Sequence, residues 1–270
     1  MERGAGKAAL PDYHVHTCFS DGEGEVAECI ERAVALQLPE IGISDHLAPA
    51  SLGDRASYAV AHHRLDRYVE AVRDAGARYR EITVLLGVEA DYLPGVEKEL
   101  AATLDAYAFD YVIGSVHYVD GFAFDEEHTR RHKLWSDVDA VYRGYYRALR
   151  LAAVFGRFDV IGHFDYAKVW GYRPVGDMTD HEREALAAVA ASGAAIEINT
   201  SGARGPAGEM YPAPGLLASA CRMGIPLTLG SDAHCVREIG EGFAEAVTLA
   251  RAAGYRSVLR LSDGRRVLLP

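Results

Sequence analysis

Histidine and carboxylate side chains gather where apolar, strand-like runs of the sequence end. His14 and His16 are separated by one residue, so on an extended strand both imidazoles point to the same face. Asp232 and His234 form a second pair with the same spacing. Other runs are followed by His46, His117, His163, Asp45, Glu89, Asp91 and Asp165, and Asp21 lies in the loop after the first run. Imidazole and carboxylate groups are common ligands of divalent metal ions.

The elements that must position these side chains alternate between strand and helix. Strands are expected near residues 12–17, 40–45, 82–91, 110–117, 160–165, 195–199 and 226–231. Helical patterns lie near residues 26–34, 64–80, 96–107, 138–155, 180–192, 214–223 and 243–253. This alternation predicts parallel strands joined by right-handed crossovers. No glycine-rich dinucleotide fingerprint follows the first strand, so the pattern favours a barrel over a doubly wound sheet.

A barrel would bring the histidines and carboxylates together. All strand C-termini of a parallel barrel open onto one face, where active sites lie. Carboxylates crowded there without cations would suffer a large desolvation penalty, and unpaired imidazoles a smaller one. Divalent cations would remove this penalty, and mixed nitrogen and oxygen donors suit Zn, Mn or Fe. The sequence therefore predicts a metal site at one end of the barrel.

The charge of the chain limits its partners. The sequence has 28 basic and 39 acidic side chains and a formal net charge of −11. Binding to nucleic acid draws much of its affinity from Lys and Arg, so no long nucleic acid is expected as a partner. A small phosphate held by divalent cations is compatible with this charge. The expected partner is therefore a small phosphate compound.

The remaining features of the sequence indicate a cytoplasmic protein. No stretch reaches the ~20 apolar residues of a membrane span, and no secretory signal precedes the four cysteines, so we expect reduced thiols and no membrane partner. Residues 1–10 are expected to form a flexible tail. The long loops expected at 120–136 and 200–214 are of a kind that is often functional. The charged run 125–133 is interpreted as a solvated loop.

Short motifs in a fixed order then carry a specific resemblance. They are DYHVHTCFSDG at 12–22, GISDHL at 42–47, GVEAD at 87–91, GSVH at 114–117, GHFD at 162–165 and GSDAH at 230–234. Together they span nearly the whole chain, which resembles the PHP (polymerase and histidinol phosphatase) family. The resemblance implies a single α/β domain over residues 11–270, a distorted (β/α)7 TIM-like barrel that holds three divalent metal ions.

The resemblance also implies a set of ligands and a reaction. One metal would take His14, His16, Glu89 and Asp232, a second Glu89, His117 and His163, and a third Asp21, His46 and His234. A hydroxide bridging the two metals that share Glu89 would attack the phosphorus of a phosphomonoester in line. Asp232, with His234 behind it, would protonate the leaving oxygen.

The substrate is indicated by the segment EINTSGARGPAGEMYPAPGLL at 197–217. This segment resembles the corresponding loop of the histidinol-phosphate phosphatase branch, which implies L-histidinol phosphate as substrate and a role in histidine biosynthesis. Arg204 is expected to contact the phosphate as a bidentate donor, with Ser201 and Asn199 as further hydrogen-bond donors. Two alternatives remain at this point: a phosphoesterase for nucleotide bisphosphates or short oligonucleotides, and a non-catalytic PHP module.

Overall fold

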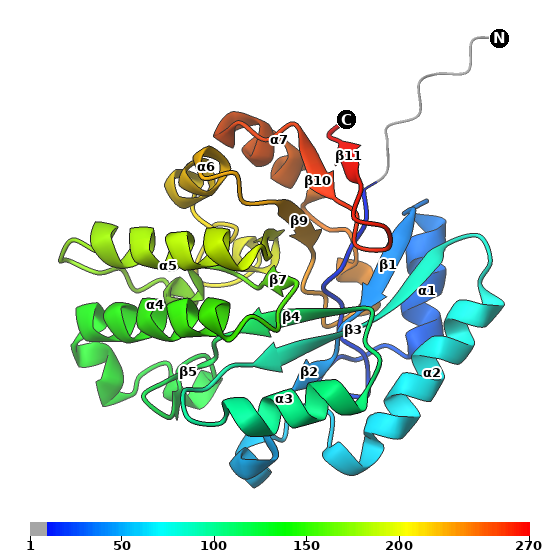
Figure 1. Cartoon of the computed structure of the whole chain (residues 1–270), viewed down its shortest axis with the longest axis horizontal. Helices are drawn as coiled ribbons and strands as arrows, with labels where there is room; N and C mark the ends of the chain where they lie inside the picture. The colour runs from blue at the N-terminus through cyan, green and yellow to red at the C-terminus, as the bar shows by residue number, and fades with distance from the viewer. Residues whose placement is uncertain (1–9) are drawn as a thin grey trace.

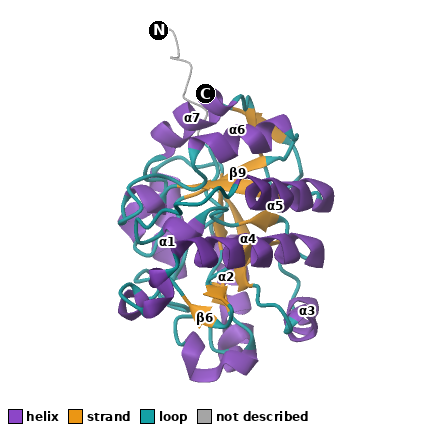
Figure 2. Ribbon diagram, turned by 90° about the vertical axis from the view of Figure 1, so that its left-hand side faces the viewer, coloured by secondary structure: helices purple, strands orange, loops and turns teal. Residues whose placement is uncertain are grey.

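A computed structural model describes residues 10–270 of the chain, and its centre is a parallel sheet of seven strands in the order β1-β3-β4-β7-β8-β9, with β2 also paired to β3. The strands are β1 (Glu40–Ile43), β2 (His46–Leu47), β3 (Thr83–Asp91), β4 (Tyr111–Ser115), β7 (Val160–Ile161), β8 (Ala195–Asn199) and β9 (Leu227–Gly230). Most residues of these strands are buried, as expected for a sheet covered on both faces. The sheet curls around its own axis, and helices lie outside it (Figures 1 and 2).

An extended segment at residues 12–16 lies between the first and last strands of this sheet. On one side Asp12 pairs in parallel with Ile41 of β1. On the other side the Tyr13 amide donates to the Leu229 carbonyl over 3.2 Å, and Val15 pairs with Ala233. The segment therefore closes the sheet into the distorted barrel that the sequence predicts.

The helices cover the outside of the barrel. They are α1 (Val26–Ala35), α2 (Leu65–Arg78), α3 (Glu97–Ala106), α4 (Val138–Phe155), α5 (Thr179–Ser192), α6 (Pro214–Arg222) and α7 (Phe243–Ala253). In α1 the buried residues are Val26, Cys29, Ile30 and Ala33, a spacing that places them on one helix face. These apolar faces pack on the strands and form the main core.

The N-terminal end of the barrel is filled and covered. Tyr13, Tyr111 and Ile113 form a separate buried cluster inside it, against Leu261 of the C-terminal segment. Gly42 and Gly87 make room for this filling, because a Cβ at either position would lie within 2.2 Å of the Tyr111 side chain. The hairpin of β10 (Ser257–Leu259) and β11 (Arg266–Leu268) belongs to the same C-terminal segment. Only the opposite end of the barrel is therefore free to hold a site.

Short elements occur in the loops at that open end. They are the hairpin strands β5 (Tyr118–Val119) and β6 (Phe122–Ala123), and the 3-10 helices η1 (Ala50–Ala56), η2 (His62–Arg64), η3 (Glu127–Thr129), η4 (Lys133–Ser136), η5 (Tyr166–Lys168), η6 (Ser201–Ala203) and η7 (Val236–Glu238). The elements η3 and η4 lie in the loop predicted at 120–136. The element η6 begins the loop predicted at 200–214, whose residues 204–213 have no regular structure apart from a single bridge at Tyr211.

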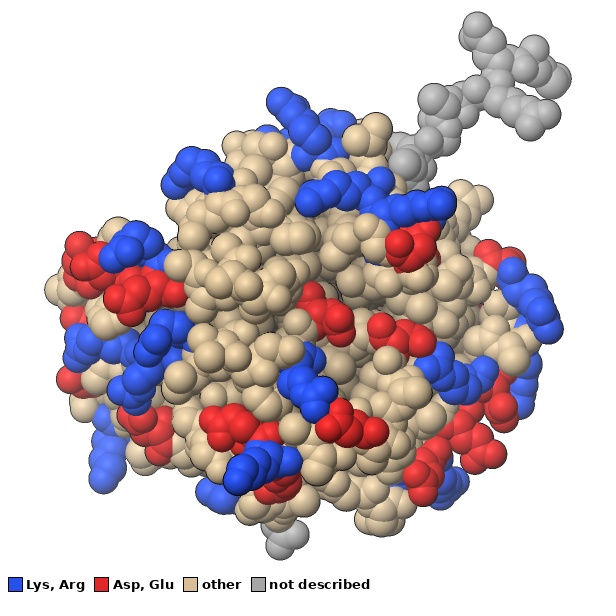
Figure 3. All heavy atoms as spheres, viewed as in Figure 1, with Lys and Arg blue, Asp and Glu red and all other residues tan. Residues whose placement is uncertain are grey.

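Two further expectations concern the chain ends and membranes. Residues 1–9 of the expected tail lie outside the described residues, whereas Leu10 is buried in the core, so the ordered core begins one residue earlier than expected. Within residues 10–270, no helix has both the length and the apolar character needed to cross a bilayer. On the face shown in Figure 3, Lys and Arg side chains are interspersed with Asp and Glu.

Candidate metal centre

Strand ends and the loops after them carry all of the predicted metal ligands at the open end of the barrel. His14 and His16 lie on the closing segment, His46 begins β2, Glu89 belongs to β3, His117 follows β4, His163 follows β7, Asp232 and His234 follow β9, and Asp21 lies in the loop before α1. Seven of them have exposed fractions between 0% and 8%, and only Asp21 and His234 are more open to solvent. The structure therefore gathers residues from across the chain at one place.

Glu89 is the centre of this group. Its Oε2 atom lies 2.8 Å from His46 Nδ1 and 3.2 Å from His14 Nε2. Its Oε1 atom lies 2.9 Å from His163 Nε2 and 3.6 Å from His117 Nε2. The two carboxylate oxygens thus face different sets of imidazoles, which is the arrangement that a bridging ligand requires.

On one side of Glu89, the closing segment meets the loop after β9. His16 Nε2 lies 3.2 Å from Asp232 Oδ1 and 3.5 Å from Glu89 Oε2, and His14 Nε2 lies 3.6 Å from Asp232 Oδ1. His14, His16 and Glu89 offer donor atoms close enough for one metal ion. Asp232 lies near these donors.

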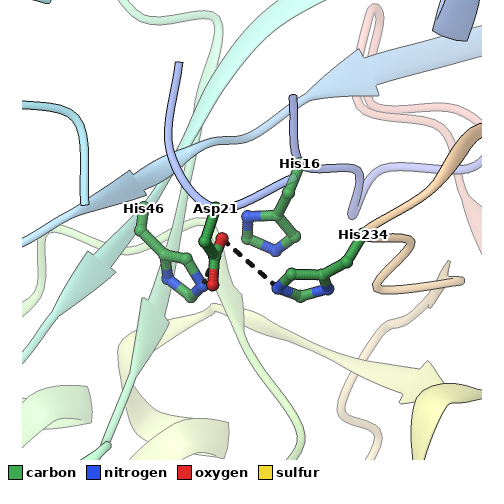
Figure 4. A group of neighbouring side chains, drawn as sticks. All are labelled: His16, Asp21, His46 and His234. Carbon is green, nitrogen blue, oxygen red and sulfur yellow. Dashed lines mark ion pairs between the residues drawn. The ribbon is translucent and has the colours of Figure 1, made fainter. Parts of the chain in front are cut away.

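A second cluster lies nearer the solvent and contains His16, Asp21, His46 and His234 (Figure 4). Asp21 Oδ1 lies 3.4 Å from His234 Nε2 and 3.7 Å from His46 Nε2. The ring of His16 stacks against that of His46 and against that of His234, with centroids 4.2 and 4.3 Å away. The sequence assigned His16 to another metal only, so its place in this cluster is new.

The nitrogen and oxygen atoms of the cluster are better suited to coordinating metal ions than to forming hydrogen bonds with one another. His14 Nε2, His16 Nε2, His46 Nδ1 and Glu89 Oε2 are buried, and within residues 10–270 none of them forms a hydrogen bond of normal geometry, although Glu89 Oε2 lies within 3.2 Å of His46 Nδ1 and His14 Nε2. Buried polar atoms normally have a partner, so a cluster of orphans indicates a missing ligand. Carboxylates and imidazoles are electron-pair donors, and a divalent cation would accept from all of them.

Electrostatics within the cluster keep His16 and Glu89 in the form that a metal ligand needs, whereas neighbouring carboxylates outweigh burial and raise the pKa of four other imidazoles, those of His14, His46, His117 and His234. Burial, together with the neighbouring His46 and His234, lowers the pKa of His16 to about 3, so its imidazole is neutral. Burial alone would raise the pKa of Glu89, but His14 and His46 outweigh it and hold that pKa well below its ordinary value. A neutral imidazole and an ionised carboxylate both have free lone pairs.

Two carboxylates behind the ligands orient the imidazoles, and the sequence-based set of site residues omits both. Glu197 Oε1 lies 3.0 Å from His14 Nδ1 and accepts from the His163 amide over 2.9 Å. Asp91 Oδ1 lies 2.5 Å from His117 Nδ1. Such partners fix the ring and leave the other nitrogen for the metal. The sequence contained a signal for Asp91: it follows Glu89 by two residues on one strand, so both side chains point to the same face.

Gly230 makes room for this outer carboxylate. A Cβ at Gly230 would lie 2.4 Å from Glu197 Oε2 and 2.6 Å from the Cβ of His14. The glycine that opens the GSDAH motif is therefore a packing requirement of the Glu197–His14 pair.

The backbone is strained at two of the ligands. His163 has φ 21° and Asp232 has φ 52°, in a region that residues other than glycine rarely adopt. Such strain persists where the surrounding structure enforces it, and it is concentrated at functional sites. Here it turns each side chain toward Glu89 and the closing segment.

The three predicted phosphate-binding residues are absent from the lining of the cavity over the ligands, and their side chains contact Asp232 and its neighbours. Arg204 donates from Nη2 to the carbonyls of Ser231 and Asp232 over 2.9 and 3.1 Å. Asn199 Nδ2 and Ser201 Oγ donate to Asp232 Oδ2 over 3.1 and 2.9 Å. All three residues therefore hold Asp232 in place, because its strained loop needs fixing on both the backbone and the side chain.

A cavity of about 230 Å³ opens over the metal ligands. Its lining consists of Asp21, His46, Tyr58, Glu89, His117, Asp125, Glu126, His163, Tyr166, Asp232 and His234. Asp125 and Glu126 come from the loop after β6, so the interpretation of 125–133 as a merely solvated loop is wrong for these two residues. No Lys or Arg belongs to this lining.

A closed parallel barrel with histidines and carboxylates at its open end is the architecture of a metallohydrolase. Comparison with known proteins identifies the family. Residues 12–201 match the family model described as PHP domain, and the chain belongs to that family.

Individual relatives and solved structures are similar to this chain over most of its length. A "probable histidinol-phosphatase" of Deinococcus radiodurans is 36% identical, over 92% of this chain and 95% of that protein. A histidinol-phosphatase of Bacillus subtilis is 28% identical, over 86% of this chain and 96% of that protein. The structure is similar to that of histidinol phosphate phosphatase from Lactococcus lactis complexed with zinc, L-histidinol and phosphate, with a TM-score of 0.79, 25% identity and coverage of 96% and 98%.

Proposed function

We propose that this chain is a metal-dependent histidinol-phosphatase that hydrolyses L-histidinol phosphate to L-histidinol and inorganic phosphate, a step of histidine biosynthesis. The observation that carries the proposal is the similarity to the histidinol-phosphatase of Deinococcus radiodurans, which extends over 92% of the chain. The complete set of candidate ligands around Glu89 supports it, since a non-catalytic module would have no need to retain them all. The four free cysteines agree with the cytoplasm as the proposed compartment.

The proposed cofactor is a cluster of three divalent ions, with Zn, Mn and Fe as candidates. His14, His16, Glu89 and Asp232 would hold one ion, Glu89, His117 and His163 a second, and Asp21, His46 and His234 a third. Close donor atoms support parts of this division: His14, His16 and Glu89 form one group, and Asp21, His46 and His234 form another together with His16. Glu89 and His117 are also grouped with His46, and His163 Nε2 lies 2.9 Å from Glu89 Oε1. Bound ions would supply an activated water as nucleophile and would stabilise charge on the phosphoryl oxygens.

Residues of the chain have distinct roles in the proposed reaction. Glu89 presents one oxygen to each of the two proposed metal groups that share it, and it sets the spacing between these groups. Asp232, with His234 behind it, is the proposed route for the proton that the leaving oxygen needs. The neighbouring imidazoles outweigh burial and hold the pKa of Asp232 well below its ordinary value, so its carboxylate would first take that proton from the attacking water. His234 Nδ1 lies 3.7 Å from Asp232 Oδ1, and both residues line the cavity. Arg204, Asn199 and Ser201 position Asp232 from behind.

The alternative substrates, nucleotide bisphosphates and short oligonucleotides, fit the cavity less well. Recognition of a second phosphate or a phosphate backbone requires basic side chains. The lining of the cavity contains none, and the net charge of the chain is −11. A single phosphate group on a small alcohol therefore matches the cavity better.

A phosphate-release assay over a panel of monoesters, with Mn or Zn added, tests the proposal. We expect kcat/KM to be highest for L-histidinol phosphate, with 3′,5′-bisphosphonucleosides and glycerol phosphate far behind. A clear preference for the bisphosphonucleosides would replace the proposed substrate. Absence of turnover on every ester, in protein shown to contain metal, would contradict the assignment as a phosphatase.

A further inference from the structure

The cavity over the ligands contains two carboxylates that belong to none of the proposed metal groups. Its lining includes five carboxylates and no Lys or Arg: Asp21, Glu89, Asp125, Glu126 and Asp232. Asp21, Glu89 and Asp232 belong to the proposed metal groups, whereas Asp125 and Glu126 lie in none of them. Two additional carboxylates would repel the phosphate group of a substrate. Their presence is understandable if another part of the substrate is positively charged.

Asp125 is the less satisfied of the two carboxylates. Glu126 Oε2 pairs with His128 Nδ1 over 3.0 Å. For Asp125, no hydrogen bond or ion pair to another side chain occurs within residues 10–270. Burial costs this carboxylate hydration, and its compensation is limited to a hydrogen bond from its own backbone amide and the nearby charges of His117 and His46. Asp125 is therefore free to pair with a ligand, and its place in the cavity lining directs that pairing to the substrate.

The backbone just before Asp125 is fixed. The Phe124 amide donates to the His117 carbonyl over 3.1 Å, and Trp170 Nε1 donates to the Phe124 carbonyl over 2.7 Å. The Phe124 side chain is fully buried and packs against the rings of Trp135 and Tyr145. Asp125 is thus held in position in advance, which lowers the entropic cost of binding a ligand.

A second cavity of about 510 Å³ adjoins the first, and Tyr58 and Glu126 belong to the lining of both. Tyr118 and Phe122 give this second cavity aromatic surface that suits a flat ring. It also contains Arg55, which disfavours a cation deep inside it. A positively charged group is therefore best placed on the near side, beside Asp125 and Glu126.

We propose that Asp125 is the specificity residue that binds a cationic ammonium group on the alcohol part of the substrate, with Glu126 as a secondary partner and the adjoining cavity as the place of the remaining ring. The inference rests on the proposed function and makes it more specific. The enzyme would select phosphate monoesters of cationic amino alcohols and discriminate against uncharged and anionic alcohols.

The test compares substrates that differ in this charge. We would measure kcat/KM of the metal-loaded wild type and of Asp125→Asn for L-histidinol phosphate and for 4-nitrophenyl phosphate. For each enzyme we take the ratio of kcat/KM for L-histidinol phosphate to kcat/KM for 4-nitrophenyl phosphate. This ratio should be about tenfold or more lower in the variant than in the wild type, as expected for a lost hydrogen bond to a charged group. Calorimetry should show a similar rise in the Kd for L-histidinol, with unchanged metal content.

Glu127→Gln is the matched control. Glu127 is the next acidic residue along the chain, its side chain is 78% exposed, and it lines neither cavity. Its substrate ratio should equal that of the wild type. Asp125→Ser provides a second variant that removes the charge if the asparagine variant folds poorly.

Two results would overturn the inference while leaving the proposed function intact. One is an unchanged substrate ratio and an unchanged Kd for L-histidinol in both Asp125 variants. The other is an equal loss on both substrates together with a loss of metal, which would make Asp125 a metal ligand. Failure of the proposed function is distinguishable, because the wild type itself would then not hydrolyse L-histidinol phosphate.

Discussion

The open end of the barrel combines two regions that are built differently. Most of the metal ligands lie on strands or directly after them, His46 and Glu89 belong to the parallel ladder itself, and Glu89 at their centre is 1% exposed. The rim that carries Asp125 and Glu126 lies on a loop between β6 and η3, with only partial burial. Strand ends give precise placement, whereas loops can change without affecting the barrel. We infer that the chemistry lies in the strand ends and the choice of substrate in the rim.

Removal of metal should have the largest effect, because it removes the chemistry of the strand ends altogether. Treatment with a chelator is expected to abolish phosphate release on every substrate and to lower Tm, since ions that bind only the folded state stabilise it. Adding Mn or Zn back should restore both. Full activity in protein from which the metal has been shown to be absent would refute the claim that metal ions at the strand ends carry out the chemistry.

Glu89→Gln should reduce turnover by about 10²–10³-fold or more, the loss typical of removing one electrostatic contact to the reacting group. The reason is that Glu89 faces two groups of imidazoles, and an amide cannot supply two anionic oxygens. Substrate preference should stay the same, because the rim is intact. Near-wild-type turnover with full metal content, measured by elemental analysis, would refute the bridging role.

Glu197→Gln tests the carboxylate behind the ligands and should have a smaller effect. Glu197 orients His14 through Nδ1, and loss of such partners typically costs about 10–100-fold in metal affinity or activity. We expect weaker metal binding in a competition assay, and partial rescue of kcat by excess metal. Unchanged metal affinity would mean that the pair only stabilises the fold.

Arg204→Met separates a positioning role from phosphate binding. Arg204 donates to the carbonyls of Ser231 and Asp232, so its loss should destabilise the fold by about 1.5–3 kcal/mol and lower kcat more than it raises KM. Urea unfolding and steady-state kinetics would measure both effects. A large rise in KM and in the inhibition constant of inorganic phosphate, with stability unchanged, would restore the phosphate-binding role expected from the sequence.

The two regions also differ in how far the sequence predicts them. Ligands at strand ends follow from local patterns: the spacing of His14 and His16 puts both on one face of a strand, and parallel topology then brings the strand ends together. The order of strands and helices was predictable for the same reason. The strand predicted at 40–45 ends at Ile43, and a separate short strand, β2, begins at His46.

Contacts that depend on loops could not be predicted in this way. Asp125 appeared in the sequence as part of a charged surface run, and only the placement of Phe124 against His117 and Trp170 brings it into the cavity. Arg204 has the charge and position expected of a phosphate ligand, and the structure adds a contact that the sequence does not indicate, from its Nη2 to the carbonyls of Ser231 and Asp232. Sequence patterns give the direction of a strand side chain, whereas the partner of a loop side chain depends on three-dimensional packing.

The central claim is that residues from separate strands hold divalent cations around Glu89. The most direct measurement is an anomalous difference map from crystals of the metal-loaded protein, collected at the absorption edge of the metal. The account predicts peaks on both sides of the Glu89 carboxylate, within bonding distance of His14 and His163. Metal-loaded crystals with no peak at Glu89, or with peaks only at surface carboxylates, would contradict it.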